Sequence, residues 1–239
     1  MAGDASGDYG YVLHSRRYRE TSLIVDFLTR ERGRVGAVAR GALRRKSGLS
    51  ASLQPMIELR LSFGGRTELL QLIRAEALGP VPMLAGERLY CLFYINELVV
   101  RLTATHDPNS ELYRIYEDAL AGLAGTCGIE GLLRRFEKQL LDALGFGLQL
   151  DCEAASGLAL EEESNYLYDV ERGPLRCGPE SSGIKLHGAT LIALAREGEL
   201  APRALREAKL LMRYVLNHHL DGRPLTSRTL FEAQASGKP

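Results

Sequence analysis

Residues 56–74 read MIELRLSFGGRTELLQLIR. Apolar and polar side chains alternate from Met56 to Phe63 with a period of two, which indicates a strand with one buried face. The pair Gly64-Gly65 can form a tight turn, and residues 67–74 are a second apolar run. Two such runs on either side of a glycine turn are typical of a β-hairpin.

Three further short runs of β-type residues precede this hairpin, at residues 11–13, 22–28 and 35–39. Turn-forming residues at 18–20 and 31–33 separate the three runs. Five short strands in so short a stretch favour a small Greek-key barrel of the OB type. An SH3-like barrel fits the same pattern and stays open as the structural alternative.

The hydrophobic period changes after Gly79-Pro80-Val81-Pro82, from that of a strand to that of a helix. Residues 151–186 differ from their surroundings because they are acidic, contain glycine and hold a strand-like run, Tyr166–Tyr168. Helices are predicted over residues 84–104, 111–121, 130–144, 188–196 and 202–220.

These patterns predict an α+β chain with a clear order of parts. The expected parts are a flexible start (1–9), a five-stranded OB-fold barrel (10–79), an all-helical domain (80–150 and 187–232) with a small acidic insert (151–186), and a flexible tail (233–239).

Charge is distributed unevenly along the chain, although 30 basic and 30 acidic side chains give a net charge of zero. Residues 16–46 hold ten basic and three acidic side chains, a net charge of +7. Residues 151–180 hold eight acidic and two basic side chains, a net charge of −6. A segment so strongly basic within a neutral chain indicates a surface for an anionic partner such as nucleic acid.

Cysteine usage and hydropathy indicate a cytoplasmic protein. The four cysteines form no C-x-x-C pair, and the chain is large enough for a core without disulfide bonds. Residues 1–10 lack the apolar stretch of a signal peptide. Charged and polar side chains interrupt the apolar run 89–102, so no membrane span is expected.

The stretch 33–47, GRVGAVARGALRRKS, contains most of the predicted nucleic-acid surface. In a strand, Arg34 and Arg40 are an even number of residues apart and point to one face. Glycine and other small residues between them would let a phosphate backbone approach closely, and guanidinium groups donate to phosphate in a planar fork. The predicted contacts are Arg16, Arg34, Arg40, Arg44, Arg45 and Lys46. A solvated, charged loop is the alternative interpretation.

Two helical segments give further candidate contacts. Arg206, Lys209 and Arg213 share one helix face and are predicted to bind DNA or a protein partner. Arg134 and Arg135 lie beside Leu132, Leu133 and Phe136, and are predicted to bind an acidic peptide with an apolar end. In each case a merely solvated basic stripe is the alternative.

Catalytic and metal-binding motifs are missing from the sequence. It contains no phosphate-binding P-loop, no G-x-S-x-G and no H-E-x-x-H. His218 and His219 are adjacent, so on a regular helix they point about 100° apart and cannot chelate one ion. A solvated acidic loop explains Glu161-Glu162-Glu163. We therefore predict no catalytic residue, no cofactor and no metal.

Several short motifs occur in the order of a known family. They are residues 12–16 with 20–23, 33–34 with 39–44, 53–55 with 63–65, 94–98, 135–146, and the stretch Gly222-Arg223-Pro224-Leu225-Thr226-Ser227-Arg228. Each motif is weak by itself, but the ordered set resembles the bacterial RecO recombination-mediator family across nearly the whole chain.

The resemblance implies a mediator of homologous recombination that is associated with the nucleoid. Such proteins bind single- and double-stranded DNA, anneal complementary strands, act with RecR, engage the C-terminal tail of single-strand-binding protein, and help RecA load. Some members carry a four-cysteine zinc site in the region that matches 151–180. Only Cys152 and Cys177 occur there, so we interpret them as packing residues. Two rival functions stay open: an adaptor whose barrel binds peptides, and a nuclease.

Overall fold

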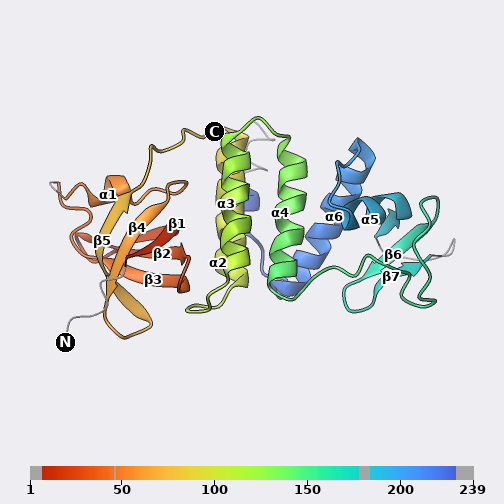
Figure 1. Ribbon diagram of the computed structural model, residues 1–239, viewed down its shortest axis with the longest axis horizontal. Coiled ribbons are helices and arrows are strands. Elements are labelled where there is room, and N and C mark those ends of the chain that lie inside the picture. The colour runs from red at the N-terminus through yellow and green to blue at the C-terminus, as the bar shows by residue number, and fades with distance from the viewer. Residues whose placement is uncertain (1–6, 46, 178–183, 230–239) are drawn as a thin grey trace. The chain divides into compact units, whose positions relative to one another are not determined.

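The computed structural model describes residues 7–45, 47–177 and 184–229. The chain forms two compact units, which are considered separately (Figure 1). The first comprises Met1–Thr126 with Leu225–Pro239, and the second comprises Cys127–Pro224. No helix in the described part of the chain is both long enough and apolar enough to cross a membrane.

The first unit begins with a closed five-stranded barrel, which confirms the predicted α+β class. The strands are β1 (Asp8–Tyr18), β2 (Ser22–Thr29), β3 (Gly33–Ala39), β4 (Leu59–Gly64) and β5 (Leu69–Ala77). Their order around the barrel is β1-β2-β3-β5-β4, and β3 pairs with β5 in parallel while the other pairs are antiparallel. This small Greek-key closure is that of an OB-fold.

The barrel interior follows the period-two patterns of the sequence. Phe27 and Phe63 meet edge to face inside it, with ring centroids 5.7 Å apart. The remaining core is aliphatic and includes Val12, Leu23, Val25, Val35, Ala37, Ala39, Leu53, Ile57, Leu59, Leu61, Leu70 and Leu72. Strand β4 begins at Leu59 rather than at Met56, because Met56 has a φ of 76° and lies in a turn. The short helix α1 (Leu49–Ser52) was not predicted.

Helices α2 (Glu87–Leu102) and α3 (Ser110–Ala124) complete the first unit. Asn109 caps α3, since its side chain accepts a hydrogen bond from the Leu112 N–H at 2.8 Å. A bulge in β1 leaves Leu13 without a partner on β2. Its carbonyl instead accepts a hydrogen bond from the buried Asn96 amide of α2 at 2.9 Å, and the Tyr116 hydroxyl donates to Asn96 at 2.8 Å. These bonds fix α2 and α3 to the barrel.

The C-terminal motif of the sequence returns to α2. Glu97 accepts hydrogen bonds from the N–H groups of Thr226 and Ser227 and from the Ser227 hydroxyl, at 2.9, 2.8 and 2.6 Å. A helical turn begins at Thr226, so the carboxylate sits at the N-terminus of that turn. Burial opposes ionisation of Glu97, but these hydrogen bonds and Arg101 outweigh it and lower the pKa of Glu97.

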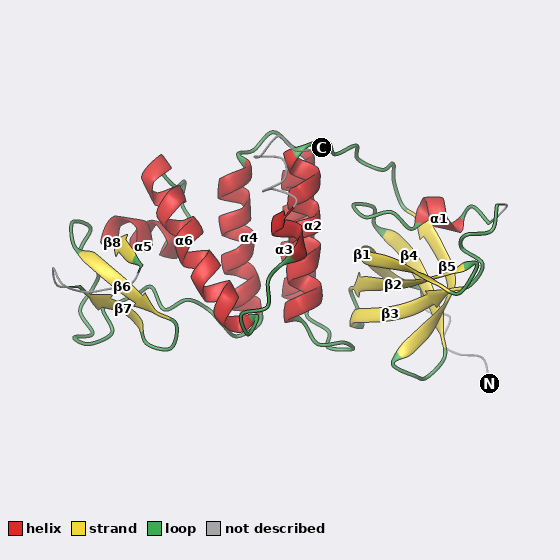
Figure 2. Cartoon of the chain, turned by 180° about the vertical axis from the view of Figure 1, so that it is seen from behind, coloured by secondary structure: helices red, strands yellow, loops and turns green. Residues whose placement is uncertain are grey.

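The second unit contains α4 (Ile129–Ala143), α5 (Gly188–Ala195) and α6 (Pro202–His219). A small antiparallel sheet of β6 (Asn165–Asp169), β7 (Gly173–Arg176) and β8 (Lys185–His187) has the order β7-β6-β8 and lies next to α5 (Figure 2). The sequence predicted the middle strand. Strands β7 and β8 are too short, at four and three residues, to show a period of their own.

Candidate nucleic-acid interface

Strand β3 presents its arginines on the outside of the barrel. Val35, Ala37 and Ala39 are buried, and the residues between them face outward. Arg34 therefore points outward, and Arg40 is exposed in the turn that directly follows Ala39. They lie at opposite ends of the strand, and their surroundings differ.

Arg34 is held by the protein itself. Its Nε donates to the Thr103 hydroxyl at 3.1 Å and one terminal nitrogen donates to the Thr103 carbonyl at 3.0 Å. The other terminal nitrogen lies 3.5 Å from Asp26 Oδ1, and the side chain is only 15% exposed. These bonds join β3 to the end of α2. Arg34 therefore has a structural role, and we do not include it among the proposed phosphate contacts because its donors already have partners within the chain.

Gly33 accommodates the protein's own backbone rather than a nucleic acid. Its φ is 66°, and a Cβ atom added there would lie 2.0 Å from the Asp107 carbonyl oxygen. The N–H of His106 also donates to the Arg34 carbonyl at 2.8 Å. The segment between α2 and α3 thus packs along this end of β3.

The neighbouring arginines of the same basic stretch are paired as well. Arg32 lies 3.7 Å from Asp8, and Arg30 lies 3.4 Å from Glu58 and 3.9 Å from Glu117. The Arg30 guanidinium also lies over the rings of Tyr9 and Tyr113, at 5.3 and 5.2 Å from their centroids. Residues 30–34 therefore contribute structural contacts rather than available positive charge.

The other end of β3 leads into a loop with exposed cations. Arg40, Arg44 and Arg45 are exposed, and none of them has an ion pair with any residue that the structure describes. The Leu43 N–H donates to the Thr21 carbonyl at 2.9 Å, which fastens this loop to the β1–β2 turn. Lys46, the last predicted cation of the loop, lies outside the described residues.

Strand β1 brings further arginines to this end of the barrel. Arg16 is in register with Ile24, and Ile24 with Val38, so Arg16 lies on the outer face in the row that precedes Arg40. At a strand spacing of about 4.8 Å, β1 and β3 are about 10 Å apart. Arg17 points to the opposite side of the strand, and Arg19 lies 5.2 Å from the ring of Tyr18.

We call this group the arginine end. It comprises Arg16, Arg17, Arg19, Arg40, Arg44 and Arg45, all of them exposed and without an ion pair to a described residue. Glu20 is the acidic side chain of the adjoining turn. The sequence pattern counted Arg17 and Arg19 as basic charge but did not select them as contacts, because only the strand register places them beside the loop after β3.

The predicted cations of α6 belong to the second unit. Arg206 and Arg213 are exposed and have no ion pair within the described ranges, whereas Lys209 lies 3.1 Å from Glu130. Leu210 and Tyr214 lie on the same face and are 50% and 42% exposed. This face combines two available guanidinium groups with two apolar side chains.

The two arginines predicted to bind a peptide on α4 differ in exposure. Arg134 is buried and lies 2.5 Å from Glu137, so it does not form an exposed cationic rim. Arg135 is exposed. Leu133 and Phe136 are buried, so they do not line an open apolar groove. Only Arg135 stays a candidate for contact with a partner.

The histidines and cysteines that the sequence offered as possible metal ligands do not form a metal site among the described residues. The described residues contain no group of three or more histidine, cysteine or acidic side chains that could hold an ion. His219 stacks on Phe146 with ring centroids 4.4 Å apart, and burial together with His218 lowers its pKa. Cys152 is exposed, so it is not the packing residue that was expected.

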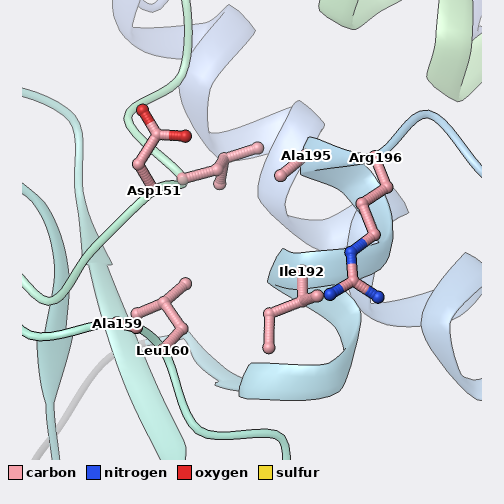
Figure 3. A pocket seen from close by; sticks show the side chains of 7 residues that line it. Asp151, Ala159, Leu160, Ile192, Ala195 and Arg196 are labelled. Carbon is pink, nitrogen blue, oxygen red and sulfur yellow. The ribbon is translucent and has the colours of Figure 1, made fainter.

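A pocket of the second unit lies between the loop that holds Leu150 and Asp151 and helix α5 (Figure 3). Its volume is about 380 Å³, and its lining is Leu150, Asp151, Ala159, Leu160, Ile192, Ala195 and Arg196. The lining is aliphatic apart from Asp151 and Arg196, so it offers no nucleophile with an adjacent base.

Known proteins match this chain over nearly its full length. The family model for the N-terminal part of recombination protein O matches residues 5–81, and the model for its C-terminal part matches residues 83–229.

Individual relatives are also similar in sequence over nearly the full length of the chain. The DNA repair protein RecO of Methylococcus capsulatus is 44% identical over 228 residues, which is 95% of this chain and 93% of the relative. That of Nitrosococcus oceani is 46% identical over 93% of this chain and 91% of the relative, and that of Stenotrophomonas maltophilia K279a is 44% identical over 95% and 97%. Two family models and these relatives lead to one conclusion: the chain belongs to the RecO family of recombination proteins.

Proposed function

We propose that this protein binds DNA through the arginine end of its barrel and anneals complementary strands. RecO proteins are non-enzymatic recombination mediators of the RecF pathway of DNA repair. The proposal includes a role in loading RecA onto DNA coated with single-strand-binding protein, and a place at the nucleoid in the cytoplasm.

The observation that carries the proposal is the unbalanced charge of the arginine end. Arginines close together repel one another unless an anion lies between them. Arg30, Arg32 and Arg34 have carboxylate partners within the chain, but Arg40, Arg44 and Arg45 have none among the described residues. Their guanidinium groups suit phosphate because they donate two parallel hydrogen bonds. Neutralising phosphates on two strands lowers the repulsion between the strands and favours pairing.

A salt series tests the proposal directly. The triple variant Arg40→Gln, Arg44→Gln, Arg45→Gln removes three phosphate contacts, so the slope of log affinity against log salt for single-stranded DNA falls by about 2. Arg114→Gln is the matched control, because Arg114 is an exposed arginine of the same unit that is paired with Asp118 at 2.9 Å. Equal slopes for the triple variant and the wild type would refute the proposal and favour a peptide-binding barrel.

Protein partners form a second part of the proposal. The exposed face of α6, with Arg206, Arg213, Leu210 and Tyr214, has the chemistry for the acidic, apolar-ended tail of single-strand-binding protein. RecR is a further proposed partner, on the strength of family membership. The binding of a labelled tail peptide to Arg213→Gln and to Arg135→Gln can be compared by fluorescence anisotropy. The variant with the weaker affinity identifies the helix that binds the peptide. An unchanged affinity in both variants would exclude both helices as the binding site.

A further inference from the structure

We propose that the outer face of β3 and β5 contacts the bases of single-stranded DNA through an aliphatic strip formed by Val38, Leu69 and Ile73. This inference rests on the proposed DNA-binding function and adds to it a contact other than phosphate. The strip adjoins the arginine end, so one strand of DNA can meet both.

The strip arises from the pairing of two strands. Gly36 is in register with Leu69 and Val38 with Gln71, so these residues share the outer face of the sheet. Leu69 and Ile73 are 41% and 66% exposed, while the alternate residues Leu70 and Leu72 are buried in the barrel. Leu69 and Ile73 thus place two large aliphatic side chains on one sheet face, where they are available for contact with a partner.

Alternation along β5 turns Ile73 outward with Leu69 and Gln71, and a bulge begins there. Ser62 of β4 pairs with Arg74, and the next residue, Phe63, pairs with Leu72, so Ile73 is the extra residue of the bulge. Ile73 and Arg74 are consequently both exposed. Bulges commonly redirect a side chain next to a binding site, and this one leaves Arg74 exposed beside Ile73.

Glycines on the neighbouring strands let the aliphatic side chains lie over the backbone. A Cβ atom added at Gly64 of β4 would lie 2.9 Å from Ile73 Cδ1, and one added at Gly36 of β3 would lie 3.4 Å from Leu69 Cδ1. The side chains therefore occupy the space that a larger residue would need at each position. The resulting surface holds three aliphatic side chains with the polar Gln71 among them, and its apolar parts suit the face of a nucleobase.

Charge identifies the occupant as nucleic acid. Arg40 lies in the turn after β3, two residues beyond Val38, and Arg16 is in the row of Val38. Arg66, exposed and without an ion pair to any described residue, lies in the loop before Leu69, beside the acidic Glu68. Cations at both ends of an apolar strip match a chain of phosphates that carries apolar base faces.

The contact selects single strands over duplex. In a duplex the base faces are stacked on one another, and only phosphates, sugars and base edges are available. A single strand can turn its bases toward the protein, as it does on other OB-folds. Aliphatic side chains replace the usual aromatic platform, so the contact is independent of sequence.

Oligonucleotides with and without bases test the inference. The full-length protein is titrated with labelled oligothymidine, with an abasic oligomer of equal length, and with a duplex. The wild type is expected to bind oligothymidine more tightly than the abasic oligomer. In the variant Leu69→Ser, Ile73→Ser this preference falls by about fivefold, because apolar contact is lost, while the abasic affinity, the duplex affinity and the salt slope stay the same.

Two further variants keep the test decisive. Leu78→Ser is the matched control, since Leu78 is 50% exposed on the barrel unit but follows β5. Ile73→Thr is a milder change that keeps the β-branched side chain, and it replaces the double variant if the double variant does not fold. It should also reduce the preference for oligothymidine over the abasic oligomer.

The outcomes separate the two proposals. An unchanged preference for bases in folded Leu69 and Ile73 variants overturns the proposal that this strip contacts bases. An absence of any salt-dependent binding by the wild type would instead contradict the DNA-binding function itself.

Discussion

The two ends of strand β3 carry the same kind of residue in different surroundings. Arg34 donates to Thr103 and lies 3.5 Å from Asp26, whereas Arg40 is exposed and has no ion pair among the described residues. Both belong to one basic stretch of the sequence. The comparison shows that local charge density does not by itself create a binding surface. What matters is whether the fold supplies internal acceptors, and here it supplies them at one end only.

The largest expected effect concerns the crowded end of β3. Gly33→Ala places a Cβ atom against the Asp107 backbone in a left-handed conformation, so the free energy of unfolding falls by about 2–4 kcal/mol. Gly48→Ala is the control, because Gly48 has a φ of 61° but nothing within 4 Å of the added atom. It should cost only about 1 kcal/mol. Urea denaturation measures both, and equal losses would mean that the packing of Asp107 on Gly33 is unimportant.

The next effect distinguishes a structural arginine from an exposed one. Arg34→Gln leaves Thr103 and Asp26 without their donor and lowers the free energy of unfolding by about 1–3 kcal/mol. Arg40→Gln removes no internal contact and changes stability by less than about 0.5 kcal/mol. Thermal or urea unfolding of the two variants checks this. A similar stability for both would remove the distinction between the two ends.

The smallest effect concerns the carboxylate that binds the C-terminal motif. The pKa of Glu97 is lowered in the folded protein, so its ionised form contributes stability above the unfolded pKa, and that stability is lost as pH falls through the folded pKa. Glu97→Gln should therefore be less stable than the wild type at neutral pH, and the difference should narrow in acid. Unfolding measured between neutral and acidic pH tests this. A difference that is constant with pH would exclude the charge of Glu97 as the cause.

Much of the fold could be predicted because its elements are long and periodic. The five barrel strands and five longer helices each show a clear hydrophobic period. Helix α1 has only four residues and β8 only three, so neither contains a full repeat of its pattern. The start of β4 was placed too early because Met56 and Ile57 are buried in a turn, where burial follows from tertiary packing rather than from strand alternation.

The candidate site was predictable only in part. Alternation correctly placed Arg34 on the outer face of β3, but the partner of Arg34 is Thr103, 69 residues further along the chain. No local pattern contains that contact. In the same way, Arg16 joins the row of Val38 only through the register of β1 with β2 and of β2 with β3. The bulge that leaves Arg74 exposed beside Ile73 is likewise a property of strand pairing.

The central claim is that nucleic acid binds the exposed arginines and leaves the internally bonded ones in place. The most direct test is the salt dependence of single-stranded DNA binding by Arg40→Gln and Arg34→Gln, measured side by side at a temperature where both variants are folded. The account predicts that the slope falls by about 0.7 for Arg40→Gln and stays at the wild-type value for Arg34→Gln. A lower slope for Arg34→Gln together with an unchanged slope for Arg40→Gln would contradict it.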